Sequence, residues 1–413
     1  MKYLKSFLEV KFRILIKGLK KDLSKFIIYS SGTLISSLIS FWTVRVINLK
    51  LPSIELGKFT YFQSILQMLF IVLSLNLYNS YLRFNTKGIV KKLESFISYF
   101  NIIMMIIFSL IIYIITNNWA TAFFSFILIY YDRMYFYRSI SDYKSLNFII
   151  VIASLITCIG CYFYFYIFNG LDPTFVLFFY GVGYFSAVFF YKRNYLFNIN
   201  EFFPFSKKEI LKFSVPLIGL TLTDIAYNFA NQFFIKHYQG YEEIANYAIA
   251  FKCLFFIRFI TSFLLLFFPV IYYREIEKGN MYIINKYRNL IVLFLFFAVL
   301  VMLYFSKIIY VIMGGEAYLE NIKLFNILLI ADFFRICTSF FSLIFTFLIK
   351  SYISLIIQFV GLVLNVILCI VFIPIYGTIG ACISVLMSIG VVFLFNIFYS
   401  KKVEKDYIGK LSL

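Results

Sequence analysis

The sequence predicts an all-α polytopic membrane protein with twelve transmembrane helices, arranged as two six-helix bundles around a central cleft. Three observations support this prediction. The chain is 62% hydrophobic and only 14% charged, which is far from the balance of soluble globular domains. Apolar stretches long enough to cross a bilayer recur along its 413 residues. Basic residues gather in alternate loops, as the positive-inside rule requires.

A basic segment, residues 1–25, precedes the first apolar span. Lysines and arginines alternate there with apolar residues, which predicts an amphipathic helix lying on the anionic cytoplasmic leaflet. A cleavable signal peptide is disfavoured, because basic residues interrupt any apolar core before residue 21.

Twelve predicted spans follow, and their loops set the orientation. They cover residues 26–49, 59–82, 97–116, 119–138, 147–168, 173–191, 210–235, 246–272, 289–313, 322–349, 353–375 and 377–400. With the N-terminus in the cytoplasm, about 29 lysines and arginines fall in cytoplasmic segments and about 3 outside. We therefore expect both termini in the cytoplasm, including the tail at 401–413.

The two halves of the chain echo each other. The longest cytoplasmic link, residues 192–209, separates six spans at 26–191 from six spans at 210–400. Lys25-Phe26 opens the first set and Lys212-Phe213 opens the second, an offset of about 187 residues. Because six is even, both sets enter the membrane in one direction. This predicts a parallel repeat with the binding site between the two bundles.

The seventh predicted span carries a polar stripe inside the membrane. Thr221, Asp224, Asn228 and Asn231 are spaced i, i+3, i+7 and i+10, so they share one face of a helix. An ionisable side chain in the bilayer core costs about 2.5–3.5 kcal/mol on insertion scales. Such a stripe therefore predicts a helix that faces a water-filled cavity.

Charged residues also occur in the eighth and tenth spans. Arg258 lies near the middle of its span, whereas Lys252 is close enough to the outer surface to snorkel there. Asp332 and Arg335 are three residues apart, so they either neutralise each other or line the cavity.

The signs of these deep charges favour an anionic substrate. Three basic residues stand against two acidic ones, and no acidic residue lies near mid-membrane in the first six spans. Such a lining attracts a pyrophosphate or an acidic sugar and disfavours a cationic drug. The candidate substrate-binding residues are Lys252, Arg258, Arg335, Asn228, Asn231, Gln63 and Gln67, and the candidate ion-coupling residues are Asp224 and Asp332.

Several other functions are disfavoured. The net charge of +19 is spread over loops rather than gathered on a soluble domain, so nucleic-acid binding is not expected. No metal site is expected either: His237 is the only histidine, and Cys158-Ile-Gly-Cys161 lies within an apolar span, where we interpret it as a helix contact. A membrane polysaccharide polymerase is disfavoured because the outer loops are short and gather no catalytic side chains.

Three dispersed motifs remain. One is Leu51-Pro52-Ser-Ile-Glu55-Leu-Gly57, another runs from Pro216 through Asp224 to Glu243-Ile-Ala-Asn-Tyr247, and the third runs from Asn365 to Pro374-Ile-Tyr-Gly377-Thr-Ile-Gly380-Ala381. In the third, we expect Pro374 to end a span, Gly377 to permit a tight turn, and Gly380 to let the next helix pack closely.

Together with the twelve spans, these motifs resemble the bacterial polysaccharide flippases. These are the O-antigen and capsule repeat-unit translocases of the multidrug/oligosaccharidyl-lipid/polysaccharide exporter superfamily. One departure is Ala245, where the family usually has Gly.

The resemblance implies a transporter rather than an enzyme, located in the bacterial inner membrane, whose central cleft opens alternately to each side. The implied substrate is an undecaprenyl-pyrophosphate-linked oligosaccharide that moves from the inner to the outer leaflet. Membrane lipids and polysaccharide polymerase or assembly proteins are the expected partners. No cofactor is expected other than a coupling ion, H⁺ or Na⁺. A multidrug or cation antiporter of the same fold is the alternative.

Overall fold

The computed structural model describes residues 31–81, 90–190, 207–348 and 350–411, and within them the chain forms helices joined by short turns, with no β-strand. Ten of the described helices are long and apolar enough to cross a membrane. The predicted all-α, multi-span membrane fold is therefore confirmed. The predicted amphipathic segment at 1–25 and most of the link at 192–209 lie outside the described residues.

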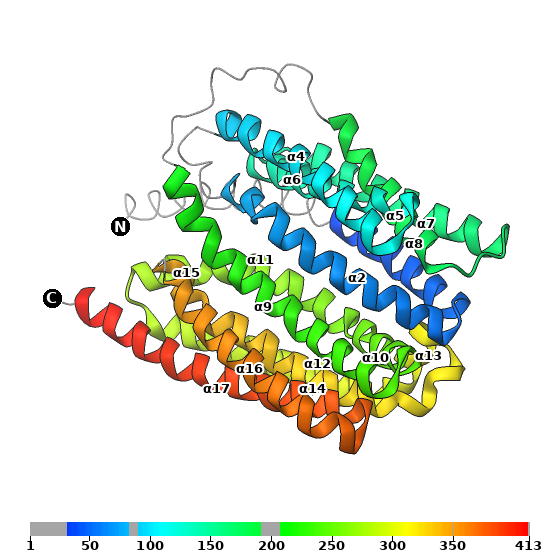
Figure 1. The fold of residues 1–413 in the computed structure, drawn as a ribbon. Coiled ribbons are helices and arrows are strands. Elements are labelled where there is room, and N and C mark those ends of the chain that lie inside the picture. The colour runs from blue at the N-terminus through cyan, green and yellow to red at the C-terminus, as the bar shows by residue number, and fades with distance from the viewer. Residues whose placement is uncertain (1–30, 82–89, 191–206, 349, 412–413) are drawn as a thin grey trace, which may run out of the picture. The chain divides into compact units, whose positions relative to one another are not determined.

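Packing divides the chain into two compact units. Unit 1 comprises Met1–Thr43, Leu77–Asn169 and Thr174–Ile210. Its described elements include the first part of the helix Ser31–Lys50, η1 (Leu77–Asn79), α4 (Val90–Thr116), α5 (Trp119–Ala122), η3 (Phe123–Phe126), α6 (Ile127–Ser139), α7 (Tyr143–Tyr166), α8 (Pro173–Phe185) and η4 (Ser186–Phe190) (Figure 1).

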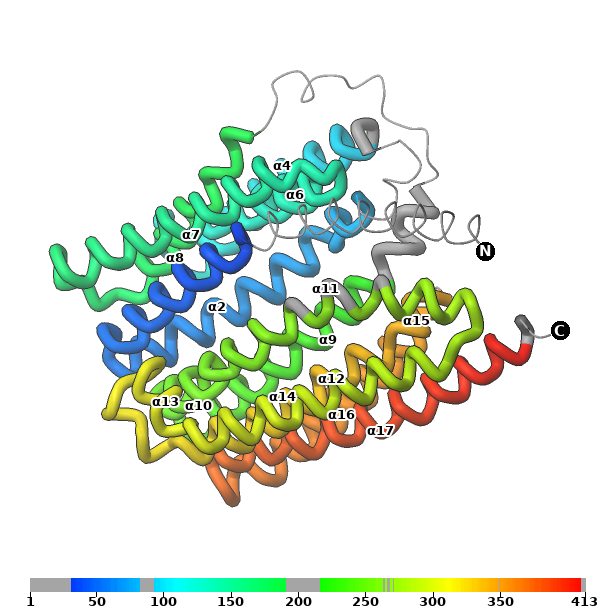
Figure 2. Tube along the Cα trace, turned by 180° about the vertical axis from the view of Figure 1, so that it is seen from behind, coloured from blue at the N-terminus to red at the C-terminus, as the bar shows by residue number. Residues whose placement is uncertain are grey.

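Unit 2 comprises Val44–Asn76, Gly170–Pro173 and Leu211–Leu413. Its described elements are α2 (Ser53–Ser74), α9 (Lys207–Gln239), α10 (Tyr241–Cys253), α11 (Phe255–Glu277), α12 (Met281–Tyr304), α13 (Ser306–Gly314), η6 (Glu316–Asn321), α14 (Ile322–Phe341), α15 (Leu343–Phe347), α16 (Ser351–Tyr376) and α17 (Thr378–Leu411). Helices α14, α16 and α17 run side by side in both views (Figures 1 and 2).

Two predicted spans differ from the long apolar helices found elsewhere. The span predicted at 119–138 is broken into α5, η3 and α6, and α6 carries the charged residues Asp132, Arg133 and Arg138. The span predicted at 210–235 lies within α9, which is 33 residues long and carries the polar stripe. Polar side chains lower the hydropathy of both segments, which explains why neither is among the ten apolar helices.

Helix α2 packs within unit 2, although it belongs to the first half of the sequence. A Cβ atom at Gly57 would overlap the carbonyl oxygen of Tyr241, so the missing side chain lets α2 approach the start of α10 closely. Farther along α2, the Ser64 hydroxyl donates to Oε1 of Gln232 on α9 at 2.9 Å. The packing units divide at Ile210, next to the link at 192–209, but unit 2 also contains Val44–Asn76 from the first half, and two six-helix bundles remain a prediction.

The turn between α16 and α17 depends on two glycines. Helix α16 continues two residues beyond Pro374 and is closed by Gly377, whose φ of 64° lies in the region that favours glycine. A Cβ at Gly380 would overlap the carbonyl oxygen of Phe372, so α17 starts in backbone contact with α16. This turn makes the two helices antiparallel neighbours.

We expect Gly57→Ala to destabilise the protein by about 1–3 kcal/mol, because the added methyl group meets a backbone carbonyl that has no rotamer to adopt. The matched control is Gly390→Ala in α17, where nothing lies within 4 Å of the added Cβ. That change should be neutral or stabilise by up to about 1 kcal/mol. Melting temperatures of the purified variants in detergent measure both effects, and equal melting of the two variants would contradict the packing described.

Candidate functional site

A polar cavity of about 390 Å³ lies within unit 2. Its wall is formed mainly by α9, α14 and α16, with smaller contributions from α15 and α17. Most of the lining side chains carry a hydroxyl or amide group, namely Thr221, Tyr227, Thr338, Ser339, Ser342, Thr346, Ser351, Ser354 and Gln358. Polar side chains that would be costly against lipid are thus gathered around one internal space.

The charged part of the cavity wall is an ion pair between α9 and α14. Nη1 of Arg335 donates to Oδ1 of Asp224 at 2.8 Å, and both residues line the cavity. The guanidinium also lies 5.7 Å from the ring centre of Tyr227. The Asp224 side chain is 63% exposed, so its carboxylate is accessible from the cavity while it holds Arg335.

A second ion pair lies directly behind the first. Nε and Nη2 of Arg258, on α11, donate to the two carboxylate oxygens of Asp332, on α14, at 3.0 and 2.8 Å. Asp332 is only 3% exposed, and its Oδ1 is 3.9 Å from Nε of Arg335. The four residues therefore form a charge chain in the order Arg258, Asp332, Arg335 and Asp224, which joins α11, α14 and α9.

The charge chain changes the electrostatic picture obtained from the sequence. The basic residues were expected to dominate the cavity, but each arginine has an aspartate as its closest partner. The i, i+3 contact between Asp332 and Arg335 exists, yet it is longer than the contacts between helices. The four charges sum to zero, so this wall offers donors and acceptors without a strong net field.

Lys252 lies away from this cavity. Its ammonium group donates to Oδ1 of Asn48 at 2.9 Å and lies 5.7 Å from the ring centre of Phe59. No described carboxylate is within ion-pair distance of it. The amide and the aromatic ring replace part of the ammonium group's hydration where α10 meets the first helix and α2.

Asn231 lies in the packed interior of unit 2 with 1% of its surface exposed. Its Nδ2 donates to the Tyr247 hydroxyl at 3.0 Å, and its Oδ1 accepts from Nδ2 of Asn365 and Sγ of Cys369, both at 3.1 Å. This hydrogen-bonded core joins α9, α10 and α16. Asn228, one turn earlier on α9, is half-buried and its Oδ1 has no hydrogen-bond partner among the described residues.

The remaining predicted site residues also lie outside the cavity lining. Gln63 and Gln67 are half-buried on α2. Pro216 lies inside α9, where the missing amide hydrogen leaves one helical carbonyl without its usual donor. Pro374 lies in the last turn of α16.

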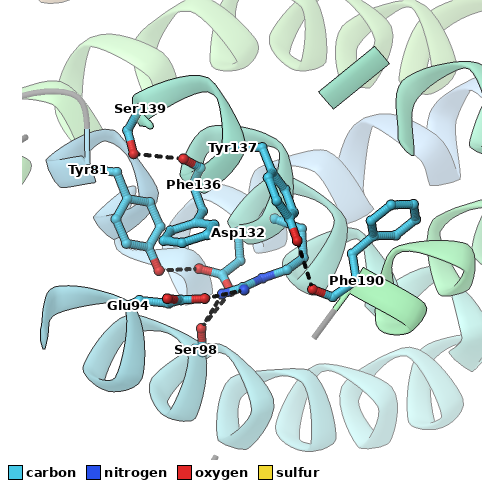
Figure 3. Close-up of polar contacts among 9 residues, drawn as sticks. Tyr81, Glu94, Ser98, Asp132, Phe136, Tyr137, Ser139 and Phe190 are labelled. Carbon is cyan, nitrogen blue, oxygen red and sulfur yellow. Dashed lines mark hydrogen bonds and ion pairs between the residues drawn. The ribbon is translucent and has the colours of Figure 1, made fainter. Parts of the chain in front are cut away.

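Unit 1 contains a buried ion cluster that the sequence analysis did not identify. Arg133 donates to Oε1 of Glu94 at 2.6 Å and to Oδ2 of Asp132 at 2.8 Å. The hydroxyls of Ser98 and Tyr81 donate to the Asp132 carboxylate at 2.9 and 2.8 Å. Figure 3 shows these side chains converging on Asp132 from α4, α6 and the segment after α2. The cluster could have been predicted from two features of the sequence. Glu94 and Ser98 share one face of α4 at i and i+4, and Asp132 and Arg133 are adjacent charged residues in the next predicted span.

No family model and no curated protein matches the sequence. Solved structures do match. An inward-facing multidrug resistance MATE family transporter of the MOP superfamily has a TM-score of 0.68 at 14% identity, over 94% of this chain and 99% of the other. Its outward-facing conformation has a TM-score of 0.64 at 13% identity, over 92% and 94%. A MATE structure in the straight conformation has a TM-score of 0.63 at 13% identity, over 92% and 95%.

This chain has the fold of the MATE transporters. The likeness extends over nearly the whole chain, and it agrees with the superfamily that the sequence motifs resembled. At 12–14% identity it establishes the fold alone.

We expect Arg258→Met to destabilise the protein by about 1–3 kcal/mol, because Asp332 then keeps a buried carboxylate without its two-bond partner. The double variant Arg258→Met/Asp332→Leu should recover most of this loss, since apolar replacement of a buried ion pair is often neutral. Arg274→Met is the control, because Arg274 is exposed and its ion pair is worth about 1 kcal/mol or less. Melting of all variants in detergent tests the pairing, which a double variant no more stable than Arg258→Met would contradict.

Substitution in the buried ion cluster of unit 1 should destabilise the protein more than Arg258→Met does in unit 2. Arg133→Met removes the shared partner of two buried carboxylates, so we expect a loss of about 3–5 kcal/mol and poor recovery of folded protein. Lys144→Met, at an exposed position of α7 in the same unit, should stay within about 0.5 kcal/mol of the parent. The yield of monodisperse protein and its melting temperature measure the difference. Similar values for the two variants would exclude a structural role for the cluster.

Proposed function

We propose that this chain is an alternating-access transporter that moves a lipid-linked oligosaccharide across the bacterial inner membrane. The observation that carries the proposal is the hydroxyl-rich lining of the unit 2 cavity. Serine, threonine and glutamine side chains both donate and accept, so they can replace the water around sugar hydroxyls. The volume of about 390 Å³ is within the range of small-molecule sites, which is about 300–1,000 Å³.

The ion pair of Asp224 and Arg335 suits the junction between sugar and phosphate. The guanidinium fork binds phosphate oxygens in the same two-bond geometry as a carboxylate, so a substrate phosphate can take the place of Asp224. Asp224 is largely exposed, and its release therefore leaves no buried bare charge. Arg258 stays bound to Asp332 in this scheme, and Asp332 orients Arg335.

The replacement of Asp224 by a substrate phosphate at Arg335 also provides a mechanism for ion coupling. A proton or Na⁺ on Asp224 would weaken its hold on Arg335 and favour the phosphate contact. Departure of that ion would restore the pair and expel the phosphate. Asp224 is the ion-coupling residue in this proposal, and Asp332 is a positioning residue, because it is buried and bound to Arg258.

A multidrug or cation antiporter is the second candidate. The likeness to transporters described as multidrug resistance MATE proteins favours it. The exposed carboxylate of Asp224 is the group that would meet a cationic substrate. Against it stands the lining itself, in which a paired aspartate and many hydroxyls replace the unpaired carboxylates that a cation prefers.

The cellular setting belongs to the same proposal. Both chain ends face the cytoplasm, the substrate arrives from the inner leaflet, and polymerase or assembly proteins receive it outside. Lys252, Asn228, Asn231, Gln63 and Gln67 keep their predicted contacts with the substrate only in a conformation other than the one described, since none of them lines this cavity.

Export assays in cells whose surface glycan depends on this chain test the proposal. Arg335→Ala should lower surface glycan by about tenfold or more at equal protein level, because a charge-assisted hydrogen bond contributes about 1.5–3 kcal/mol. Asp224→Asn should also lower export and should remove its dependence on the coupling ion. Arg274→Ala, a loss of an exposed arginine outside the cavity, should leave export unchanged.

The competing function has its own assay. Accumulation of a lipophilic cationic dye should be the same with and without the protein if the substrate is a glycolipid. Full glycan export by normally expressed Arg258→Ala and Arg335→Ala proteins would contradict the flippase proposal. Dye efflux that Asp224→Asn abolishes would establish the antiporter in its place.

A further inference from the structure

A second cavity of about 590 Å³ lies in unit 2 where the start of α12 meets the end of α17. Figure 2 shows α17 running on to the C-terminal end of the chain. The lining differs from that of the polar cavity in every residue. It combines Arg288, Lys401 and Lys405 with Glu404, the one acidic residue among those that line it. This cavity is therefore a separate, basic site.

The floor of the basic cavity is a buried ion pair. Nη1 of Arg288 donates to Oε1 of Glu404 at 2.8 Å, and Nη2 donates to Oδ1 of Asn285 at 2.6 Å. The Tyr272 hydroxyl also donates to Glu404 at 2.8 Å. Arg288 is 1% exposed, yet its Nε has no hydrogen-bond partner among the described residues. A buried guanidinium donor left without an acceptor is unfavourable.

The rim of the basic cavity carries unneutralised positive charge. Lys401 and Lys405 are exposed and one helical turn apart on α17, and neither has an ion-pair partner among the described residues. Since Arg288 and Glu404 cancel, the two lysines leave the cavity with two positive charges. The amide of Asn289 adds a hydrogen-bond donor at the same opening. These donors and positive charges are the groups that bind the oxygen atoms of a phosphate.

The basic cavity opens onto apolar surface that continues along both helices. Leu394 and Phe398 on α17 are each 66% exposed, and with Lys401 and Lys405 they follow the spacing i, i+4, i+7 and i+11 on one helix face. On α12, Leu293 lies four residues beyond Asn289 and is also exposed. A ligand seated here would therefore meet charge at one end and lipid-like surface at the other.

We propose that the basic cavity binds the phosphodiester headgroup of an anionic phospholipid, with the acyl chains lying along the exposed faces of α12 and α17. The positive charges alone would fit a free phosphate, but the adjoining apolar faces fit a lipid. The expected topology places this end of unit 2 at the cytoplasmic leaflet, which is rich in anionic lipids. The ligand of this site is a lipid of the surrounding bilayer and not the transported substrate, so the inference goes beyond the proposed function.

Lipid-dependent stability of the purified full chain tests this proposal. Phosphatidylglycerol should raise the melting temperature of the delipidated protein by about 3 °C or more above phosphatidylcholine with the same acyl chains. Lys401→Gln/Lys405→Gln should lose most of that rise, and each single variant should lose part of it. Lys402→Gln is the control, because Lys402 is an exposed neighbour that does not line the cavity, and it should keep the full rise.

Three results would overturn the proposal. An equal rise in the double variant would place the lipid elsewhere, and an equal loss in Lys402→Gln would mean diffuse surface charge rather than a site. The same rise with inorganic phosphate at the lipid's concentration would identify a free anion as the ligand. The melting temperature in phosphatidylcholine shows whether each variant is folded, and glycan export plays no part in the readout, so failure here is distinct from failure of the proposed function.

Discussion

The cost of removing charged groups from water governs much of this structure. In a chain with so few charged residues, each charged side chain that is buried among the described residues lies in an ion pair. Arg258, Asp332, Arg335 and Asp224 form one chain in unit 2, and Arg133 gathers two carboxylates in unit 1. Each cluster joins different helices: Arg258 on α11 binds Asp332 on α14, and Arg133 on α6 binds Glu94 on α4. The same requirement that keeps the charges out of lipid therefore fixes which helices are neighbours.

The placement of these charges also explains how binding chemistry and stability are shared between the two ion pairs of unit 2. Asp332 is sealed beneath Arg258, so its charge is committed to holding α11 against α14. Asp224 is open to the cavity, so its bond to Arg335 can exchange with a ligand. One aspartate thus provides a fixed support, and the other provides a replaceable partner. Arg335 lies between the two aspartates: Asp332 orients its guanidinium group, and Asp224 is its exchangeable partner.

Much of the fold was readable from the sequence because bilayer thickness sets the length of an apolar helix. Ten of the twelve predicted spans coincide with long apolar helices, whereas the segment at 119–138 does not form one continuous helix. Of the stripe predicted on α9, Thr221 and Asp224 line the cavity, whereas Asn228 and Asn231 do not. Asn231 lies seven residues beyond Asp224, a rise of about 10.5 Å, and there it contacts α10 and α16. Periodicity gives the angle around a helix and contains no information on which neighbour covers each turn. Pairing between helices was missed for the same reason, and with it the neutrality of the charge chain.

The bond between Arg258 and Asp332 has a consequence for the history of the chain as well as for its present stability. Loss of Arg258 alone leaves the Asp332 carboxylate, which is only 3% exposed, without its two-bond partner, so selection acts against that single mutant. Loss of Asp332 alone is less costly, because the Arg258 side chain is 38% exposed. Distant descendants of this sequence should therefore keep Arg258 wherever they keep Asp332, even where the surrounding apolar positions have been replaced many times.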